Sequence, residues 1–304
     1  MAGGALRAEL AGGRWHFQHG PIDLIIGADG EPDAVAHAHQ QAWVRFEQVL
    51  PELVAELGAL RQPVGPCGPG LLGPIARCMQ AACMPLLDEA QGFITPMAAV
   101  AGAVAQDIVA CYAQAGVQRA WVNNGGDIAL YLTPGTHARV GLVADLQRWD
   151  GAALARTSLE PLRPDAGMRV HHADPVRGVA TSGWPGRSHS LGIADSVTVL
   201  AATATQADAA ATVVANAVNA DHPGIQRAPA RSLRDDSDLG ERLVTVAVPP
   251  LPESVREQAL QAGVACAQRL QARGLLHAAV LVCQGSLARL MPAQPLQSAV
   301  QLVQ

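Results

Sequence analysis

Residues 178–212 constrain the fold most strongly, because a polar turn, a strand pattern and a helix pattern follow one another there. The small residues Thr181-Ser182-Gly183 predict a turn whose backbone amides can approach an anionic group closely. The run over 196–201 predicts a strand, and the alanine-rich run after it predicts a helix over 205–219. We therefore expect a ligand-binding turn beside a strand-to-helix connection.

Asp208 and Thr212 lie four residues apart near the start of that helix, so they share one face. A carboxylate and a hydroxyl in this arrangement can bind one hard cation, together with backbone carbonyls and ligand phosphate oxygens. A purely structural interpretation is also open, because an aspartate in a first helical turn stabilises the free amides there.

A second polar turn, Asn123-Asn124-Gly125-Gly126-Asp127, follows a predicted strand over 118–124. Asp127 either contacts a ligand, such as a ribose, or caps the tight turn. The two asparagines either hydrogen-bond the edge of a heterocycle or stabilise the same turn. The two glycine-containing turns resemble two walls of one site.

His189 and Arg187 are two residues apart, so on a strand-like segment they face the same side. The histidine is a candidate for proton transfer, and the arginine fork suits a phosphate or carboxylate. A solvent-exposed histidine in a serine-flanked turn is the alternative.

Composition narrows the functional class. The chain has 304 residues, of which 49% are hydrophobic and 15% charged, so it can bury a substantial core. It contains no lysine, which excludes a Schiff-base lysine and a phosphate-loop lysine. A formal net charge of −5 argues against general nucleic-acid binding.

The N-terminal residues lack the pattern of a signal peptide, and no apolar run reaches membrane-spanning length, so we expect a cytoplasmic protein. The six cysteines contain no C-x-x-C pair. Cys67, Cys78 and Cys83 cluster loosely, which leaves a metal or redox role open beside that of free thiols.

The remaining elements mix strands and helices without a regular βαβ alternation, which predicts a single α+β domain over 1–304. We expect a hairpin over 14–29, a helix over 31–60 with a break or kink at Pro51, and a polar surface loop over 221–241. Further helices are expected over 75–86, 95–114 (with Thr95 as N-cap) and 252–274, and further strands over 128–133, 138–145, 168–172, 242–248 and 278–284. The 95–114 helix is rich in alanine and glycine, and Gly102 in its interior predicts the close approach of a ligand or another helix.

Four motifs together resemble the ApbE superfamily: Val122 to Ile128, Ala180 to Gly183, Ser196 to Val199, and Ala207 to Thr212. This superfamily includes the FAD:protein FMN transferases, and the whole-chain pattern is most similar to its soluble, uncharacterised ApbE-like (UPF) branch. The resemblance covers about residues 95–215. It implies an α+β, ApbE-like (T-fold-like) fold with mixed sheets packed against helices.

The resemblance also implies a site. Asp208 and Thr212 would bind a divalent metal, usually Mg²⁺, with the carbonyls of Ala211 and Ala101. The 123–127 and 181–183 turns would line the pocket for FAD or FMN, and His189 would assist the transfer. The chain departs from the transferase pattern because Ala101-Gly102-Ala103 lacks the lysine found there.

Three functions follow. The first is a metal-dependent enzyme that binds a flavin or a similar nucleotide and performs group transfer or hydrolysis. The second is a catabolic enzyme, or a flavin-dependent reductase, acting on a small heterocyclic or aromatic acid held by Arg187. The third is a non-enzymatic flavin carrier. In each case we expect a small-molecule ligand, no nucleic acid and no membrane partner, and we allow for a homo-oligomer.

Overall fold

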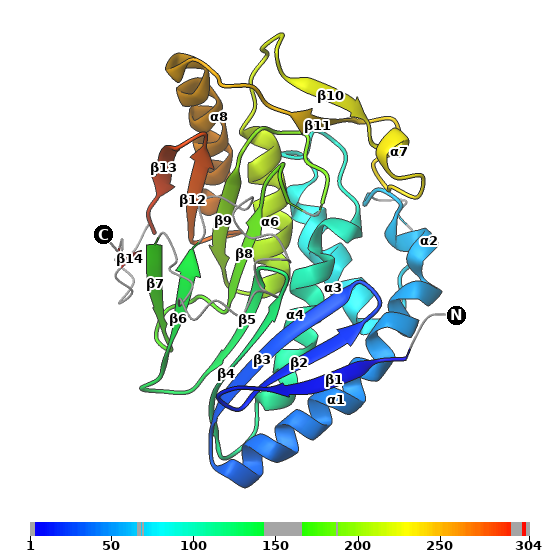
Figure 1. The fold of residues 1–304 in the computed structure, drawn as a ribbon, viewed down its shortest axis with the longest axis vertical. Helices are drawn as coiled ribbons and strands as arrows, with labels where there is room; N and C mark the ends of the chain where they lie inside the picture. The colour runs from blue at the N-terminus through cyan, green and yellow to red at the C-terminus, as the bar shows by residue number, and fades with distance from the viewer. Residues whose placement is uncertain are drawn as a thin grey trace. The chain divides into compact units, whose positions relative to one another are not determined.

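The structure, a computed structural model, describes residues 4–65, 68, 70–142, 166–186, 188–292 and 300–301. The chain forms two compact units whose sequence ranges alternate (Figure 1). Unit 1 comprises Met1–Ala138, His171–Ala180 and Leu200–Ala210, and unit 2 comprises Arg139–Val170, Thr181–Val199 and Ala211–Gln304. The expected single domain stays a prediction.

An antiparallel sheet forms the centre of unit 1. Its strands lie in the order β1 (Leu6–Leu10), β2 (Arg14–His19), β3 (Ile22–Gly30), β4 (Val117–Asn124) and β5 (Asp127–Leu132), and the first residues of β8 (Gly178–Ser182) pair with β5. The hairpin predicted over 14–29 is confirmed by the pairing of β2 with β3. Strand β1 is not among the predicted elements, and its residues are almost all exposed.

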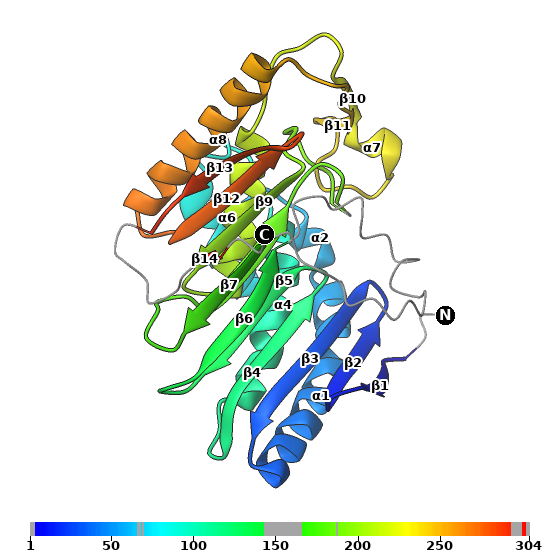
Figure 2. The same cartoon turned by 60° about the vertical axis from the view of Figure 1, so that its left-hand side comes forward.

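Helices cover one face of this sheet, as Figure 2 shows for α1 and α4. The helical elements of unit 1 are α1 (Pro32–Ala55), α2 (Leu57–Leu60), α3 (Pro74–Cys83), η1 (Met84–Leu86), η2 (Pro96–Ala99), α4 (Val100–Val109) and η3 (Ala110–Tyr112), and α6 (Ala204–Ala217) begins here. Phe17 of β2 and Phe46 of α1, both fully buried, lie with ring centroids 5.4 Å apart in the core. Of the break or kink expected at Pro51, the break is wrong, because α1 continues through this proline to Ala55, and the kink stays a prediction.

In unit 2, residues of β9 (Ser196–Ala201) are followed in the sheet order by β12 (Ala278–Cys283) and β13 (Ser286–Leu290). Helix α8 (Glu253–Ala272) packs on β12, where Gly263 faces Leu281. A three-stranded sheet has the order β14 (Val300–Gln301), β7 (Ala166–His171), β6 (His137–Leu142), and some residues of β6 and β7 are assigned to unit 1. A separate two-stranded sheet consists of β10 (Gln226–Pro229) and β11 (Leu243–Ala247), with the short helix α7 (Ala230–Leu233) between them in the sequence.

Most predicted elements are confirmed, and with them the α+β class: β4, β5, β9, β11, β12, α6 and α8 begin and end within a few residues of the expected positions. Two interpretations are wrong. Thr181 and Ser182 complete strand β8 instead of forming a turn. The 221–241 segment is not a plain loop, since β10 pairs with β11 and α7 lies between them. Within the described ranges, no helix combines the length and apolar character that a bilayer span requires.

Candidate functional site

The candidate site in unit 1 begins with the close approach of α4 and α6 at Gly102. A Cβ added at Gly102 would lie 2.8 Å from the Cβ of Asp208 and still closer to the carbonyl oxygen of Ala204. Only glycine fits there without displacing the backbone of the other helix. The close packing expected around this alanine- and glycine-rich helix therefore comes from α6.

Asp208 caps the N-terminus of α4. Its Oδ2 accepts a hydrogen bond of 2.8 Å from the backbone N–H of Gly102, and the N–H of Ala101 also hydrogen-bonds this carboxylate. Helix α4 begins at Val100, so both amides belong to its first turn and have no partner within the helix. The interpretation that Asp208 stabilises its own helix is wrong, because α6 has no acidic residue in its first turn.

Gln106 of α4 provides the reciprocal contact. Its Oε1 accepts hydrogen bonds from the backbone N–H and the hydroxyl of Thr205, at 3.2 and 2.7 Å, in the first turn of α6. Each helix thus caps the other on either side of Gly102. The sequence analysis missed Gln106, and the only available signal was its position one turn after Gly102.

The 123–127 turn is a tight hairpin that connects β4 with β5, with Asn124 opposite Asp127. Gly125 and Gly126 have φ angles of 66° and 115°, in the left-handed region that favours glycine. The Asn123 side chain accepts a hydrogen bond of 2.8 Å from the N–H of Gly126, so its turn-stabilising role is observed.

Asn124 ties this hairpin to α4. Its side chain is only 5% exposed, and its Nδ2 donates a hydrogen bond of 3.1 Å to the carbonyl of Ala101. The predicted residues Asn124, Asp127, Ala101 and Asp208 therefore lie together in unit 1.

The electrostatics of this cluster centre on Asp208. Burial, and after it the neighbouring Asp127 carboxylate, raise the pKa of Asp208 well above its ordinary value, while the amides of Gly102 and Ala101 lower it. None of these groups carries a positive charge. Part of the Asp208 surface nevertheless stays accessible, so a cation could reach this carboxylate, which lies under the electrostatic influence of the buried Asp127.

Oxygen donors dominate this cluster. In the part of the chain that the structure describes, no group of three or more His, Cys, Asp and Glu residues could hold a metal ion. A cation here would therefore rely on Asp208, carbonyl oxygens such as that of Ala101, and ligand oxygens, which suits Mg²⁺ better than a soft metal.

Unit 2 holds other predicted residues. The hydroxyls of Thr181 and Thr198 are 2.9 Å apart, on neighbouring strands. Gly183 packs against the backbone of Asp195, where a Cβ would clash, so packing accounts for this glycine. Ser182 ends β8 and is partly exposed.

His189 is partly buried in unit 2, and its Nε2 is buried with no hydrogen-bond partner among the residues that the structure describes. Burial, and then the nearby Arg234, lower the pKa of His189, while Asp238 opposes them. The ring therefore favours the neutral form that can accept a proton. Arg187, the predicted anion-binding residue, lies outside the described residues, as does Cys67.

Ala211 and Thr212 follow Asp208 on α6 and belong to unit 2. Ala211 is fully buried, and Thr212 is partly exposed. Their roles as metal ligands stay predictions.

Comparison with known proteins gives the family. A family model described as "AbpE bacteria" matches residues 7–289. A UPF0280 protein of Methanosphaerula palustris is 31% identical over 216 residues, covering 71% of this chain and 80% of that protein. A UPF0280 protein of Methanopyrus kandleri is 36% identical over 156 residues, covering 51% and 55%. This chain spans about half the length of several such relatives.

Two solved structures are also similar. The apo flavinyl transferase ApbE of Pseudomonas stutzeri is 14% identical, with 95% of both chains covered and a TM-score of 0.46. The apbe protein of Thermotoga maritima is 11% identical, with 95% of this chain and 96% of that chain covered and a TM-score of 0.49. On the family model and the M. palustris relative, the chain belongs to the AbpE family of bacteria, in the UPF0280 branch of the ApbE-like superfamily.

Proposed function

We propose that this protein binds a flavin nucleotide together with a divalent cation, and that it carries out flavin-related group transfer. The flavin comes from family membership, because the ApbE superfamily, to which the motifs point, includes FAD:protein FMN transferases. FAD, which carries a pyrophosphate, is the expected substrate, and FMN the expected fragment transferred.

The observation that carries the proposal is the Asp208–Asp127 pair in unit 1. Two neighbouring carboxylates raise each other's proton affinity unless a cation compensates their charge. Among the described residues, the groups that shift the pKa of Asp208 include no positive charge, and part of Asp208 is accessible. The donor set therefore fits a hard divalent cation.

Asp208 and the Ala101 carbonyl would hold that cation, with Thr212 and the Ala211 carbonyl as the further predicted ligands. When bound, a divalent cation neutralises the negative charge of a pyrophosphate. The hydrogen bonds from Gly102 and Asn124 hold the Asp208 carboxylate and the Ala101 carbonyl in place before a cation binds, so less conformational entropy is lost on binding.

The predicted flavin contacts of Asn123 to Asp127, and of Thr181, Ser182 and Gly183, extend the proposal. His189 is the predicted proton carrier, and its lowered pKa supports the neutral form that this task needs. Alanine at His189 should reduce turnover more than flavin affinity. Loss of affinity with unchanged turnover would contradict this role.

The test is calorimetric titration of FAD and FMN into the purified chain, with Mg²⁺ and then with a chelator, followed by analysis of the nucleotides for AMP and FMN. We expect Mg²⁺-dependent binding of FAD and cleavage of its pyrophosphate when an acceptor is supplied. Binding of neither nucleotide would contradict the proposal. Binding without cleavage under any condition would favour a flavin carrier.

A further inference from the structure

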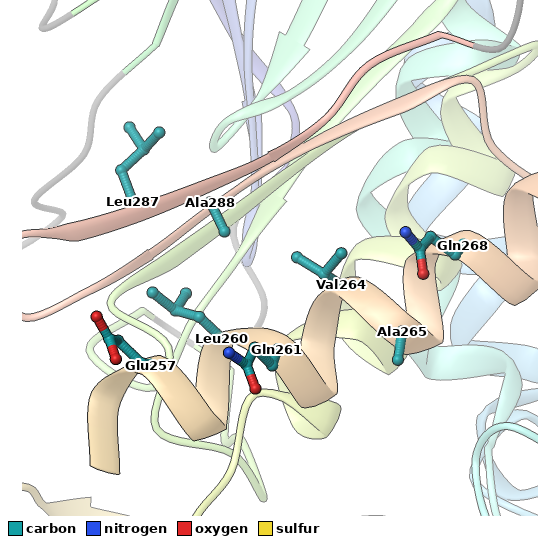
Figure 3. Close-up of a pocket in the computed structure, with 8 residues that line it drawn as sticks. All are labelled: Glu257, Leu260, Gln261, Val264, Ala265, Gln268, Leu287 and Ala288. Atoms are coloured by element: carbon teal, nitrogen blue, oxygen red, sulfur yellow. The ribbon is translucent and has the colours of Figure 1, made fainter. Parts of the chain in front are cut away.

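An open groove lies between α8 and the edge strand β13 of unit 2 (Figure 3). It has a volume of about 510 Å³, and Leu260, Val264 and Ala265 of α8 are among the residues that line it. Glu257 and Gln268 lie toward its two ends, and Ala288 of β13 points into it from above. The groove thus follows one flank of a helix directly beneath a strand.

The outer edge of β13 has backbone groups available for pairing. Strands β12 and β13 form a hairpin closed by Cys283 and Ser286, with Gln284 and Gly285 at positive φ. In such a hairpin Ser286, Ala288 and every second residue bond to the partner strand. The N–H and C=O groups of Leu287 and Arg289 therefore point outward, and β13 is the last strand in the sheet order of the described residues.

The usual protection of an edge strand is limited here to one exposed charged side chain, that of Arg289. No proline and no bulge interrupts the described pairing of β13 with β12, and the chain has no lysine to place on the edge. Leu287 is 46% exposed. This combination predicts pairing with another strand.

We propose that the α8–β13 surface, meaning the groove and the outer edge of β13, is the interface with a second copy of this chain. Antiparallel pairing of two β13 strands about Ala288 places Leu287 of each copy opposite Arg289 of the other. Both residues present outward backbone groups, so the edge is self-complementary, as a two-fold interface requires.

The helix flank has the same symmetry. Glu257, Gln261, Val264 and Gln268 recur at helical spacing along the groove. A two-fold axis near Ala288 brings two α8 helices together in antiparallel orientation. Glu257 of one copy then approaches the C-terminal half of the other α8. There the side-chain amide of Gln268 can donate a hydrogen bond to the Glu257 carboxylate. The antiparallel alignment of the two helix dipoles favours this orientation. Small side chains at Val264 and Ala265 permit the close approach.

The register gives a sharp test by cysteine cross-linking. Across the two-fold axis the two Ala288 residues form a non-hydrogen-bonded pair, with Cα atoms about 4.5 Å apart, which is within the range for a disulfide. Ala288→Cys should therefore form a covalent dimer under mild oxidation. Ser286→Cys is the matched control, because this position lies opposite Leu290 of the second copy and not opposite itself.

The assembly itself is tested by sedimentation of the full chain. We expect a species of twice 31.5 kDa, and a dissociation constant raised roughly tenfold or more by Val264→Arg. Leu233→Arg, at a leucine of α7 that is about as exposed as Leu287, should leave the dimer intact. A wild-type monomer at all concentrations, a dimer that Val264→Arg does not weaken, or equal cross-linking of both cysteine variants would overturn the proposal. Circular dichroism of each variant confirms folding.

Discussion

Asp208 combines two roles that ordinary mutagenesis would confuse, a negative charge and a helix cap. Its carboxylate faces Asp127 and also accepts the N–H of Gly102. Asparagine keeps a side-chain oxygen for the cap but removes the charge, whereas alanine removes both. The two substitutions therefore separate cation binding from stability.

We predict that Asp208→Asn abolishes Mg²⁺-dependent flavin binding and leaves the melting temperature of the free protein nearly unchanged. Asp208→Ala should lose the same binding and also about 1 kcal/mol of stability, the typical contribution of a cap. Calorimetry and thermal unfolding measure the two effects. Asp88→Asn, at an exposed carboxylate of unit 1, should change neither. Unaltered Mg²⁺ dependence in Asp208→Asn would show that the carboxylate only caps α4.

Gly102→Ala should destabilise the protein by about 1–3 kcal/mol, because the new methyl group meets the backbone of α6. Gly58 is a matched control, since it is also helical and a Cβ there meets nothing within 4 Å. Gly58→Ala should be neutral or slightly stabilising. Chemical denaturation gives both values, and equal effects of the two substitutions would refute the close-packing argument.

The sequence pattern predicted Asp208, Asp127 and the two asparagines as candidate site residues. It also predicted that a ligand or another helix approaches closely at Gly102. It did not predict that Asp208 caps a helix 106 residues earlier in the chain. A cap of this kind depends on tertiary packing, and no local spacing encodes it. For the same reason the local sequence does not show that Gln106 accepts a hydrogen bond from Thr205, and its position one turn after Gly102 was the one signal it carried.

At the scale of elements, α4 and α6 form one clamp through reciprocal caps. We predict that Gln106→Ala and Asp208→Ala each lower the free energy of unfolding by about 1 kcal/mol, and that the double variant loses less than the sum. The reason is that either substitution loosens the helix contact on which the other cap depends. Additivity within about 0.3–0.5 kcal/mol would mean that the two caps act independently.

Element predictions failed where small or polar residues carry the backbone pairing. The composition of Thr181 and Ser182 is typical of a turn, yet these residues complete β8, and the Thr181 hydroxyl lies within hydrogen-bonding distance of the Thr198 hydroxyl on β9. The 221–241 segment reads as a loop, yet β10 pairs with β11. In both cases pairing with a distant strand overrides local propensity. Long amphipathic or apolar runs, such as α8 and β9, were predicted correctly.

At the scale of the whole molecule, the buried pair of His39 and Tyr112 predicts a pH dependence of stability. His39 is 7% exposed, its Nδ1 lies 2.6 Å from the Tyr112 hydroxyl, and burial lowers its pKa. In the unfolded chain His39 takes up a proton near pH 6.5, whereas in the folded chain it stays neutral to lower pH. The free energy of unfolding therefore falls as the pH drops below about 6.5. Thermal unfolding between pH 8 and 5 should show this, and His39→Leu should flatten the curve. An equally steep curve in His39→Leu would assign the dependence to other groups.

The central claim is that the Asp208–Asp127 cluster binds a divalent cation next to a flavin nucleotide. The most direct test is a crystal structure of the protein with FAD and Mn²⁺, which replaces Mg²⁺ and gives an anomalous signal. We predict an anomalous peak at about 2.1 Å from an Asp208 oxygen, in contact with the FAD pyrophosphate. FAD bound without a peak beside Asp208, or a peak elsewhere in the molecule, would contradict the account.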